Sequence, residues 1–349
     1  MPVPYLKADL KLGPDQTNDP ALVRALQRDL RALGYLRASI DGAYGAGTLG
    51  AVRALQFDLL HNDGASRGND GSASVAIADF NLGPDGQPWI DSVTGIVDPP
   101  TASCIDRMLN DERVGRIPAA ADPAGENRQA ISAIASMASA VAPAPFIVAI
   151  VMQESGGQHF RVPVSDDDNF VVVGLDHGDK ANPERITSRG YGIGQYTLFH
   201  HPPRSEELAD FILDPVNNVQ RAFGELRGKF DRFLVGPSDY ADDRKREHPL
   251  LPLRMCRYPP GDVRYLRDCR NCALQARKIN ISQGTPFFAG AAATYQPDQY
   301  YKSATYFGVP DRADFLCDWP YAVRRYNGSG NDSFHYQTRV LSNLLRLPQ

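Results

Sequence analysis

The sequence predicts a mainly α-helical protein organised in two domains. Its 349 residues, 42% of them hydrophobic, can form two ordinary cores at about 100–200 residues per domain. A segment at 23–30 recurs at 52–59, and both copies space apolar residues as one face of a helix requires. Another apolar run, 144–154, has Pro145 near its start and two glycines after its end, which is typical of a helix with defined limits.

Composition excludes several classes of function. The formal net charge of −4 argues against binding along a nucleic-acid backbone, which needs a basic face. No apolar run approaches the roughly 20 residues that cross a bilayer, so no membrane span is expected. Residues 1–7 lack the basic and then apolar segments of a secretory signal peptide. A protein that works outside the cytoplasm would then need another export route.

The first copy of the repeat is expected to form a complete helix. Asp19 precedes a proline, which is typical of a capped helix start, and Gly34 is a typical stop. Asp41 and Gly42 mark a tight turn, after which Thr48 can cap the second helix.

A long polar stretch at 61–92 follows the second helix. It is rich in Gly, Asp, Ser and Asn, so we expect an inserted loop. Residues 93–101 then lead into a third short helix at 102–109. The next stretch, 114–125, is rich in Ala, Pro and Gly and is expected to be a linker to a second domain at 126–349.

The three helices and their turns resemble the peptidoglycan-binding module of many bacterial and phage cell-wall enzymes. The matching residues are Leu26-Gln27, Leu33-Gly34-Tyr35, Asp41-Gly42, Thr48 and Gly95 to Thr101. The resemblance implies a three-helix module over 15–113 that binds peptidoglycan glycan strands. The residues it suggests for wall binding are Tyr35, Asp41, Gly42, Tyr44 and Thr48. A three-helix adaptor without a ligand is the alternative.

Glu154 is expected in the last turn of its helix. Ile150 and Val151 lie one turn before it, so desolvation penalises the charged carboxylate, and the negative end of the helix dipole repels it. Both effects raise the expected pKa. Cleavage of a glycosidic bond needs such a protonated carboxyl group as its general acid. A solvated glutamate at a helix end is the plain alternative.

Two later segments carry side chains suited to a sugar. The turn at 192–195 has glycines two apart beside Gln195, so backbone could approach a ligand and the amide could bind it. Tyr326 and Asn327 end a helix-like stretch, and Tyr336 follows on another. A tyrosine can stack on a sugar face and hydrogen-bond at its rim, although a core aromatic is the alternative for Tyr326.

In their order these segments resemble the lysozyme-like transglycosylases and goose-type lysozymes of glycoside hydrolase family 23. The matches are Glu154-Ser155, Gly192-Ile193-Gly194-Gln195, Asp214-Pro215-Val216-Asn217-Asn218 and Ala322 to Asn327, with Tyr336 after them. The resemblance implies a lysozyme-like α domain with a small hairpin region, and Glu154 as the catalytic residue. It implies substrate-binding roles for Ser155, Gly192, Ile193, Gly194, Gln195, Tyr326, Asn327 and Tyr336. Gly194 stands where the family usually has methionine, and a near-match at 291–296 competes for the Tyr326 position.

The resemblance implies cleavage of the β-1,4 bond between N-acetylmuramic acid and N-acetylglucosamine. Glu154 would act as acid and then as base, leaving 1,6-anhydro ends. A hydrolase is the rival, because an inverting enzyme needs a second carboxylate about 6.5–9.5 Å from the first. The candidates for it lie in the acidic stretch up to Asp179 and include Asp166, Asp168 and Asp176. A non-catalytic wall-binding protein is the third alternative.

The cysteines leave three alternatives open. Four of the five lie in or after a segment at 235–275 that departs from the family core and is expected to be an insertion. A structural zinc site, disulfides and free thiols are each compatible with Cys256, Cys269, Cys272 and Cys317. No cofactor is expected, and no metal in a catalytic role.

The expected place of action is the periplasm or cell wall. Without a signal peptide, three ways for a bacteriolytic protein to reach the wall remain. It could be a phage endolysin released through a holin, a virion-associated enzyme or a type VI secretion effector. An effector would imply a cognate immunity protein as a partner in the producing cell.

Overall fold

The computed structural model describes residues 2–65, 73–136, 143–163 and 168–234. It also describes 256, 258–259, 261–265, 267–269, 317–319, 323–327 and 331–347. The chain divides into two compact units, the first made of residues 1–127 and 158–218, the second of 128–157 and 219–349. The described residues are rich in helix and hold one small sheet, which agrees with the predicted mainly α-helical class.

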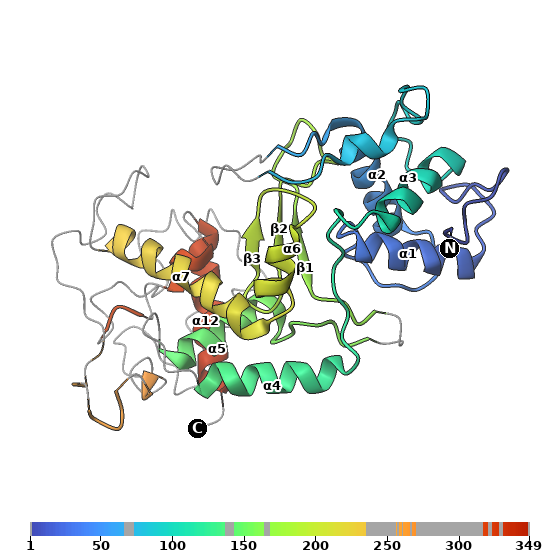
Figure 1. Ribbon diagram of the computed structural model, residues 1–349. Coiled ribbons are helices and arrows are strands. Elements are labelled where there is room, and N and C mark those ends of the chain that lie inside the picture. Colours follow the sequence, from blue (N-terminus) through green and yellow to red (C-terminus); the bar gives the residue numbers. More distant parts are fainter. Residues whose placement is uncertain are drawn as a thin grey trace. The chain divides into compact units, whose positions relative to one another are not determined.

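Three helices in the N-terminal part of the first unit follow the predicted pattern (Figure 1). They are α1 (Pro20–Ala32), α2 (Ala46–His61) and α3 (Pro99–Asn110). The Asp19 carboxylate accepts a 2.8 Å hydrogen bond from the Ala21 amide, and Gly34 lies beyond the end of α1 with φ +76°. Thr48 is not the cap of α2: the helix begins two residues earlier, and Thr48 is buried in its first turn.

The sequence repeat is also a repeat of hydrogen bonds. In the first copy, the Gln27 side-chain oxygen accepts the amides of Asp41 and Gly42 at 3.0 and 2.8 Å. The Gln27 side-chain nitrogen contacts Asp41 Oδ1, Ala43 O and Thr48 Oγ1. One buried side chain therefore fixes both the tight turn and the start of α2.

The second copy makes the same set of bonds. The Gln56 side-chain oxygen accepts the amides of Thr94 and Gly95 at 3.0 and 2.7 Å, and its nitrogen reaches Ile96 O and Thr101 Oγ1. Because Gln56 lies 38 residues before Thr94 while Gln27 lies 14 before Asp41, the insertion lengthens the connection without altering the turn.

The insertion is more than the loop that its composition predicts. In its described part, a short helix η1 (Ile77–Asn81) buries Ile77 and Phe80 in the core. The Asn81 side chain closes the segment by bonding both backbone groups of Ile90, at 2.8 and 2.9 Å. Apolar residues hidden among polar ones thus anchor the insertion to the module.

A three-stranded antiparallel sheet follows in the first unit, in the order β1-β2-β3. The strands are β1 (Val173–Asp176), β2 (Ser188–Tyr191) and β3 (Tyr196–Leu198). Gly174 faces Gly190 across β1 and β2, and Tyr191 faces Tyr196 across β2 and β3. Helix α6 (Ser205–Glu207) and the π-helical turn η2 (Leu208–Ile212) continue from the sheet.

The helical module and the sheet share one hydrophobic core. The cluster that holds Leu26 and Leu30 of α1 also holds Val171, Tyr191 and Phe211. This packing explains why the compact units do not follow the predicted boundaries at 113 and 126.

The segment predicted as a linker, 114–125, packs within the first unit instead. Its Ile117 amide bonds Ala32 O at 2.7 Å and its Ala120 amide bonds Asn169 O at 3.0 Å. The side chains of both residues are buried. Buried side chains and backbone hydrogen bonds therefore hold this segment within the first unit.

The second unit is built mainly from helices. They are most of α4 (Pro123–Ser136), α5 (Ala144–Ser155), most of α7 (Pro215–Leu234), the short η7 (Val323–Asn327) and α12 (Asn331–Arg346). Helix α5 is buried from Phe146 to Val151 and packs against α12, whose Asn343 side chain bonds Ala149 O at 3.3 Å. As predicted, α5 ends where Gly156 takes φ +65°. None of the described helices is long and apolar enough to cross a membrane.

Candidate functional site

Glu154 lies in the last turn of α5 with a half-buried side chain. The hydroxyl of Tyr336, on α12, donates a 2.5 Å hydrogen bond to Glu154 Oε1. Burial, followed by the nearby Glu154 carboxylate, raises the pKa of Tyr336 well above its usual value, so the phenol remains a donor at neutral pH. The structure therefore brings together two predicted site residues that are 182 positions apart.

An aromatic stack continues from this pair. The Tyr326 ring lies 6.2 Å from the Tyr336 ring and 5.4 Å from the Phe223 ring, with interplanar angles of 22° and 25°. Tyr326 is half-buried, whereas its neighbour Asn327 is exposed. Sequence reasoning missed Phe223, because an apolar residue in the α7 pattern predicts only a core contact.

The turn at 192–195 lies in the first unit, and its geometry corrects the expectation of an exposed backbone. Gly192, Ile193 and Gly194 are buried, and their amides bond Val172 O, His159 Nδ1 and Asn218 Oδ1. These three donors are used inside the unit. Only Gln195 is partly exposed in this turn.

Two fully buried polar side chains hold this turn in place. His159 Nδ1 accepts the Ile193 amide at 3.2 Å, and His159 Nε2 lies 2.7 Å from Ile212 O. The Asn218 oxygen accepts the Gly194 amide at 2.8 Å, and its nitrogen donates to Tyr191 O at 2.8 Å. Asn218 belongs to the predicted Asp214 motif. No residue pattern pointed to His159.

The tautomer of His159 follows from these contacts. Since Nδ1 faces an amide donor and Nε2 faces a carbonyl oxygen, the proton belongs on Nε2. Burial lowers the pKa of His159 to about 4, so the ring is neutral at neutral pH and can accept at Nδ1.

Ser155 bonds within its own helix. Its hydroxyl donates to Val151 O at 3.1 Å, so the substrate-binding role that the resemblance implies for it stays a prediction.

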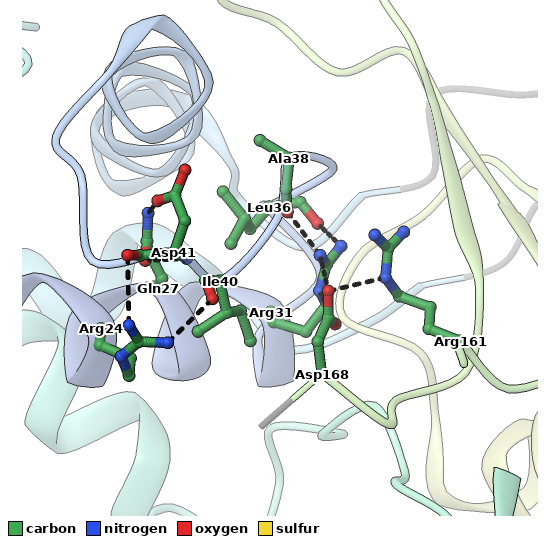
Figure 2. Close-up of polar contacts among 9 residues, drawn as sticks. All are labelled: Arg24, Gln27, Arg31, Leu36, Ala38, Ile40, Asp41, Arg161 and Asp168. Carbon is green, nitrogen blue, oxygen red and sulfur yellow. Dashed lines mark hydrogen bonds and ion pairs between the residues drawn. The ribbon is translucent and has the colours of Figure 1, made fainter. Parts of the chain in front are cut away.

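The carboxylates considered for a hydrolase are engaged in structural contacts. Asp168 is buried between Arg31 and Arg161, with its oxygens 3.0 and 2.9 Å from their Nε atoms (Figure 2). Asp176 accepts a 2.9 Å bond from the Ser188 hydroxyl on the neighbouring strand. Asp166 lies outside the described residues. With both oxygens paired to arginines, Asp168 has the contacts of a structural ion pair and not those of a base that activates water.

The residues predicted to bind the wall divide into two groups. Tyr35 and Thr48 are buried, and the Tyr35 hydroxyl donates to Asp58 at 2.8 Å, so they support the module from inside. Asp41 is exposed, and the hydrogen bond from Gln27 lowers its pKa, which keeps a carboxylate at the surface (Figure 2).

The other two wall-binding candidates shape this surface. Gly42 has φ +79°, and a Cβ there would lie 2.9 Å from Pro20 O, so the turn requires glycine. Half-buried Tyr44 donates its hydroxyl to Gly95 O at 2.8 Å and thereby joins the two repeated turns. Asp41, Tyr44 and the backbone between them are therefore what the first turn offers a ligand.

The cysteine alternatives stay open. The described part of the chain contains no group of three or more His, Cys, Asp or Glu side chains that could hold a metal ion. Cys104, Cys269 and Cys317 are buried and Cys256 is half-buried. Cys272, most of the 235–275 insertion and the 291–296 near-match lie outside the described residues.

Comparison with known proteins identifies one part of the chain. The model of the family "Putative peptidoglycan binding domain" matches residues 19–59, which span α1, the Asp41–Gly42 turn and most of α2. No curated protein and no solved structure matches the chain. Residues 19–59 therefore correspond to a peptidoglycan-binding domain, which supports peptidoglycan as a partner and an association with the cell wall.

Proposed function

We propose that the protein is a peptidoglycan-cleaving muramidase that acts as a lytic transglycosylase, with Glu154 as its acid and base. The bond cleaved is the β-1,4 link between N-acetylmuramic acid and N-acetylglucosamine. The observation that carries the proposal is the hydrogen bond between Tyr336 and Glu154, which positions a carboxyl group at the end of an apolar helix. The peptidoglycan-binding domain supports the choice of substrate.

The reaction needs only one carboxyl group from the protein. Glu154 protonates the leaving glycosidic oxygen, and the acetamido group of the substrate stabilises the positive charge that develops at the anomeric carbon. The Glu154 carboxylate then takes the proton of the 6-hydroxyl, which attacks the anomeric carbon and closes the 1,6-anhydro ring. Since Tyr336 holds Oε1, we assign the transferred proton to Oε2.

The aromatic stack supports a sugar-binding role for Tyr326. Its ring is stacked with the rings of both Phe223 and Tyr336, at interplanar angles of 25° and 22°. The exposed part of a half-buried tyrosine fixed in this way can contact a sugar at little cost in side-chain entropy. Within the first unit, we assign glycan binding to the partly exposed side-chain amide of Gln195.

The main alternative is a wall-binding protein without catalytic activity. The family match at 19–59 is equally compatible with this alternative, because it concerns a binding domain. The hydrolytic alternative has less support, because Asp168 is neutralised by two arginines. We place delivery by a phage lysis system or as a secreted effector with an immunity partner among the proposals, since both bring such an enzyme to the wall.

A digest of purified peptidoglycan sacculi tests the proposal. We expect the wild type to release fragments with 1,6-anhydro ends, seen by mass spectrometry, and Glu154→Gln to release none while still sedimenting with sacculi. Reducing ends alone would identify a hydrolase. Sedimentation without any release by the wild type would identify a binding protein.

A further inference from the structure

The backbone of Gln195 takes a conformation that needs support. Its φ is +52°, in the left-handed region that residues other than glycine rarely adopt. Such residues persist only where the surrounding structure determines them, and they gather at ligand-binding and catalytic sites. Gln195 is also the partly exposed residue of a turn whose other members are buried.

The sheet provides a place for the Gln195 side chain. Its amide nitrogen donates to Gly192 O at 2.7 Å. A Cβ added at Gly174 or Gly190 would lie only 2.4 or 2.9 Å from the Gln195 side-chain oxygen. Because these two glycines face each other across β1 and β2, they form a gap that this oxygen fills.

His159 and Asn218 hold the remaining side of the turn. Together they accept the two consecutive amides of Ile193 and Gly194, and both side chains are completely buried. A Cβ at Gly192 would lie 2.5 Å from the His159 ring, so ring and turn are in direct contact. Asn127 fixes the backbone of the histidine, because its oxygen accepts the His159 amide at 2.9 Å.

We propose that His159 is a positioning residue for Gln195: through its acceptor at Nδ1 it holds the 192–195 turn in the strained form in which Gln195 binds the glycan. This inference rests on the proposed function. His159 acts through the turn and does not itself touch the sugar.

Two substitutions of His159 separate its hydrogen bond from its bulk. His159→Leu removes the acceptor, whereas the side-chain oxygen of His159→Asn can still accept the Ile193 amide. In the full-length protein we expect His159→Leu to speed hydrogen exchange of the Ile193 and Gly194 amides at least tenfold. His159→Asn should restore most of the protection, and His177→Leu, at an exposed histidine, should leave both rates unchanged.

Glycan binding provides the functional readout. With soluble uncross-linked glycan strands as the probe and Glu154→Gln as the background, we expect His159→Leu and Gln195→Ala each to weaken binding about tenfold. The double variant should lose no more than Gln195→Ala alone, because the histidine acts through the glutamine. His159→Asn should bind like the background protein.

Three results would overturn the inference. They are unchanged exchange in His159→Leu, losses that add in the double variant, and wild-type affinity in Gln195→Ala. A wild type that releases no fragments from sacculi refutes the catalytic proposal instead, and the binding comparison still decides the role of His159.

Discussion

Arg31 and Asp168 form a buried ion pair between residues 137 positions apart. The guanidinium of Arg31 also donates to the carbonyl oxygens of Leu36 and Ala38 (Figure 2). It therefore connects the end of α1 with the loop that follows it and with Asp168, which precedes β1. A second buried pair, Arg189 with Asp58, joins the sheet to α2 at 3.5 Å. The peptidoglycan-binding domain is therefore packed against the rest of the first unit and is not joined to it by a flexible linker.

Asp168→Asn should destabilise the first unit by about 3 kcal/mol, because it leaves the buried Arg31 without its countercharge. Urea denaturation at pH 7 measures the change. Asp176→Asn is the matched control: this aspartate is exposed and accepts one bond, so the expected change is within about 1 kcal/mol. Equal stability of the two variants would contradict the role assigned to the Arg31 pair.

Gln27→Ala and Gln56→Ala should each lower the free energy of unfolding by about 2–3 kcal/mol. Each substitution leaves two backbone amides without their acceptor and also removes the hydrogen bonds that the side-chain nitrogen donates. Thermal or urea unfolding measures both. A large loss from only one of the two substitutions would show that the repeated hydrogen bonds are not energetically equivalent.

Local signals in the sequence predicted the helices well. The limits of α1 follow from Asp19, Pro20 and Gly34, and the end of α5 follows from its two glycines, because capping and left-handed glycines act within a few residues. The order of motifs also singled out Glu154 and Tyr336, which the structure places in contact.

Contacts between distant segments could not be predicted in this way. Tyr35 was expected at the wall-binding surface, but Asp58 accepts its hydroxyl and Arg189 lies over its ring, so it is buried. His159 and Phe223 gave no signal, because their roles depend on partners brought near by folding. The prediction of a linker at 114–125 was wrong for the same reason, because Ala32 and Asn169, which bond this segment, are distant in the sequence.

Tyr336→Phe should lower kcat about 10- to 100-fold on soluble glycan strands, because it removes a hydrogen bond to Glu154 worth about 1.5–3 kcal/mol. The stacked ring remains, so KM should change much less than kcat. Tyr258→Phe is the control, since it removes a tyrosine bond to another carboxylate, Asp268. Wild-type turnover in Tyr336→Phe would remove this contact from the mechanism.

Asp29→Asn should stabilise the protein above pH 6 and not at pH 4. Burial raises the pKa of Asp29 from 3.8 to about 6, while the Tyr5 hydroxyl donates to it at 2.6 Å. A raised pKa means that the fold favours the protonated acid, so this contribution is complete below pH 3.8 and is lost as the pH rises through 6. The asparagine cannot ionise and still accepts from Tyr5.

The expected gain is about 1–3 kcal/mol at pH 7.5, since one pKa unit corresponds to about 1.4 kcal/mol. Urea denaturation at pH 4 and pH 7.5 measures it, with Asp91→Asn at an exposed aspartate as the control. Wild type should lose stability relative to Asp29→Asn as the pH rises between these values. A gain of the same size at both pH values would show that the charge of Asp29 is not its source.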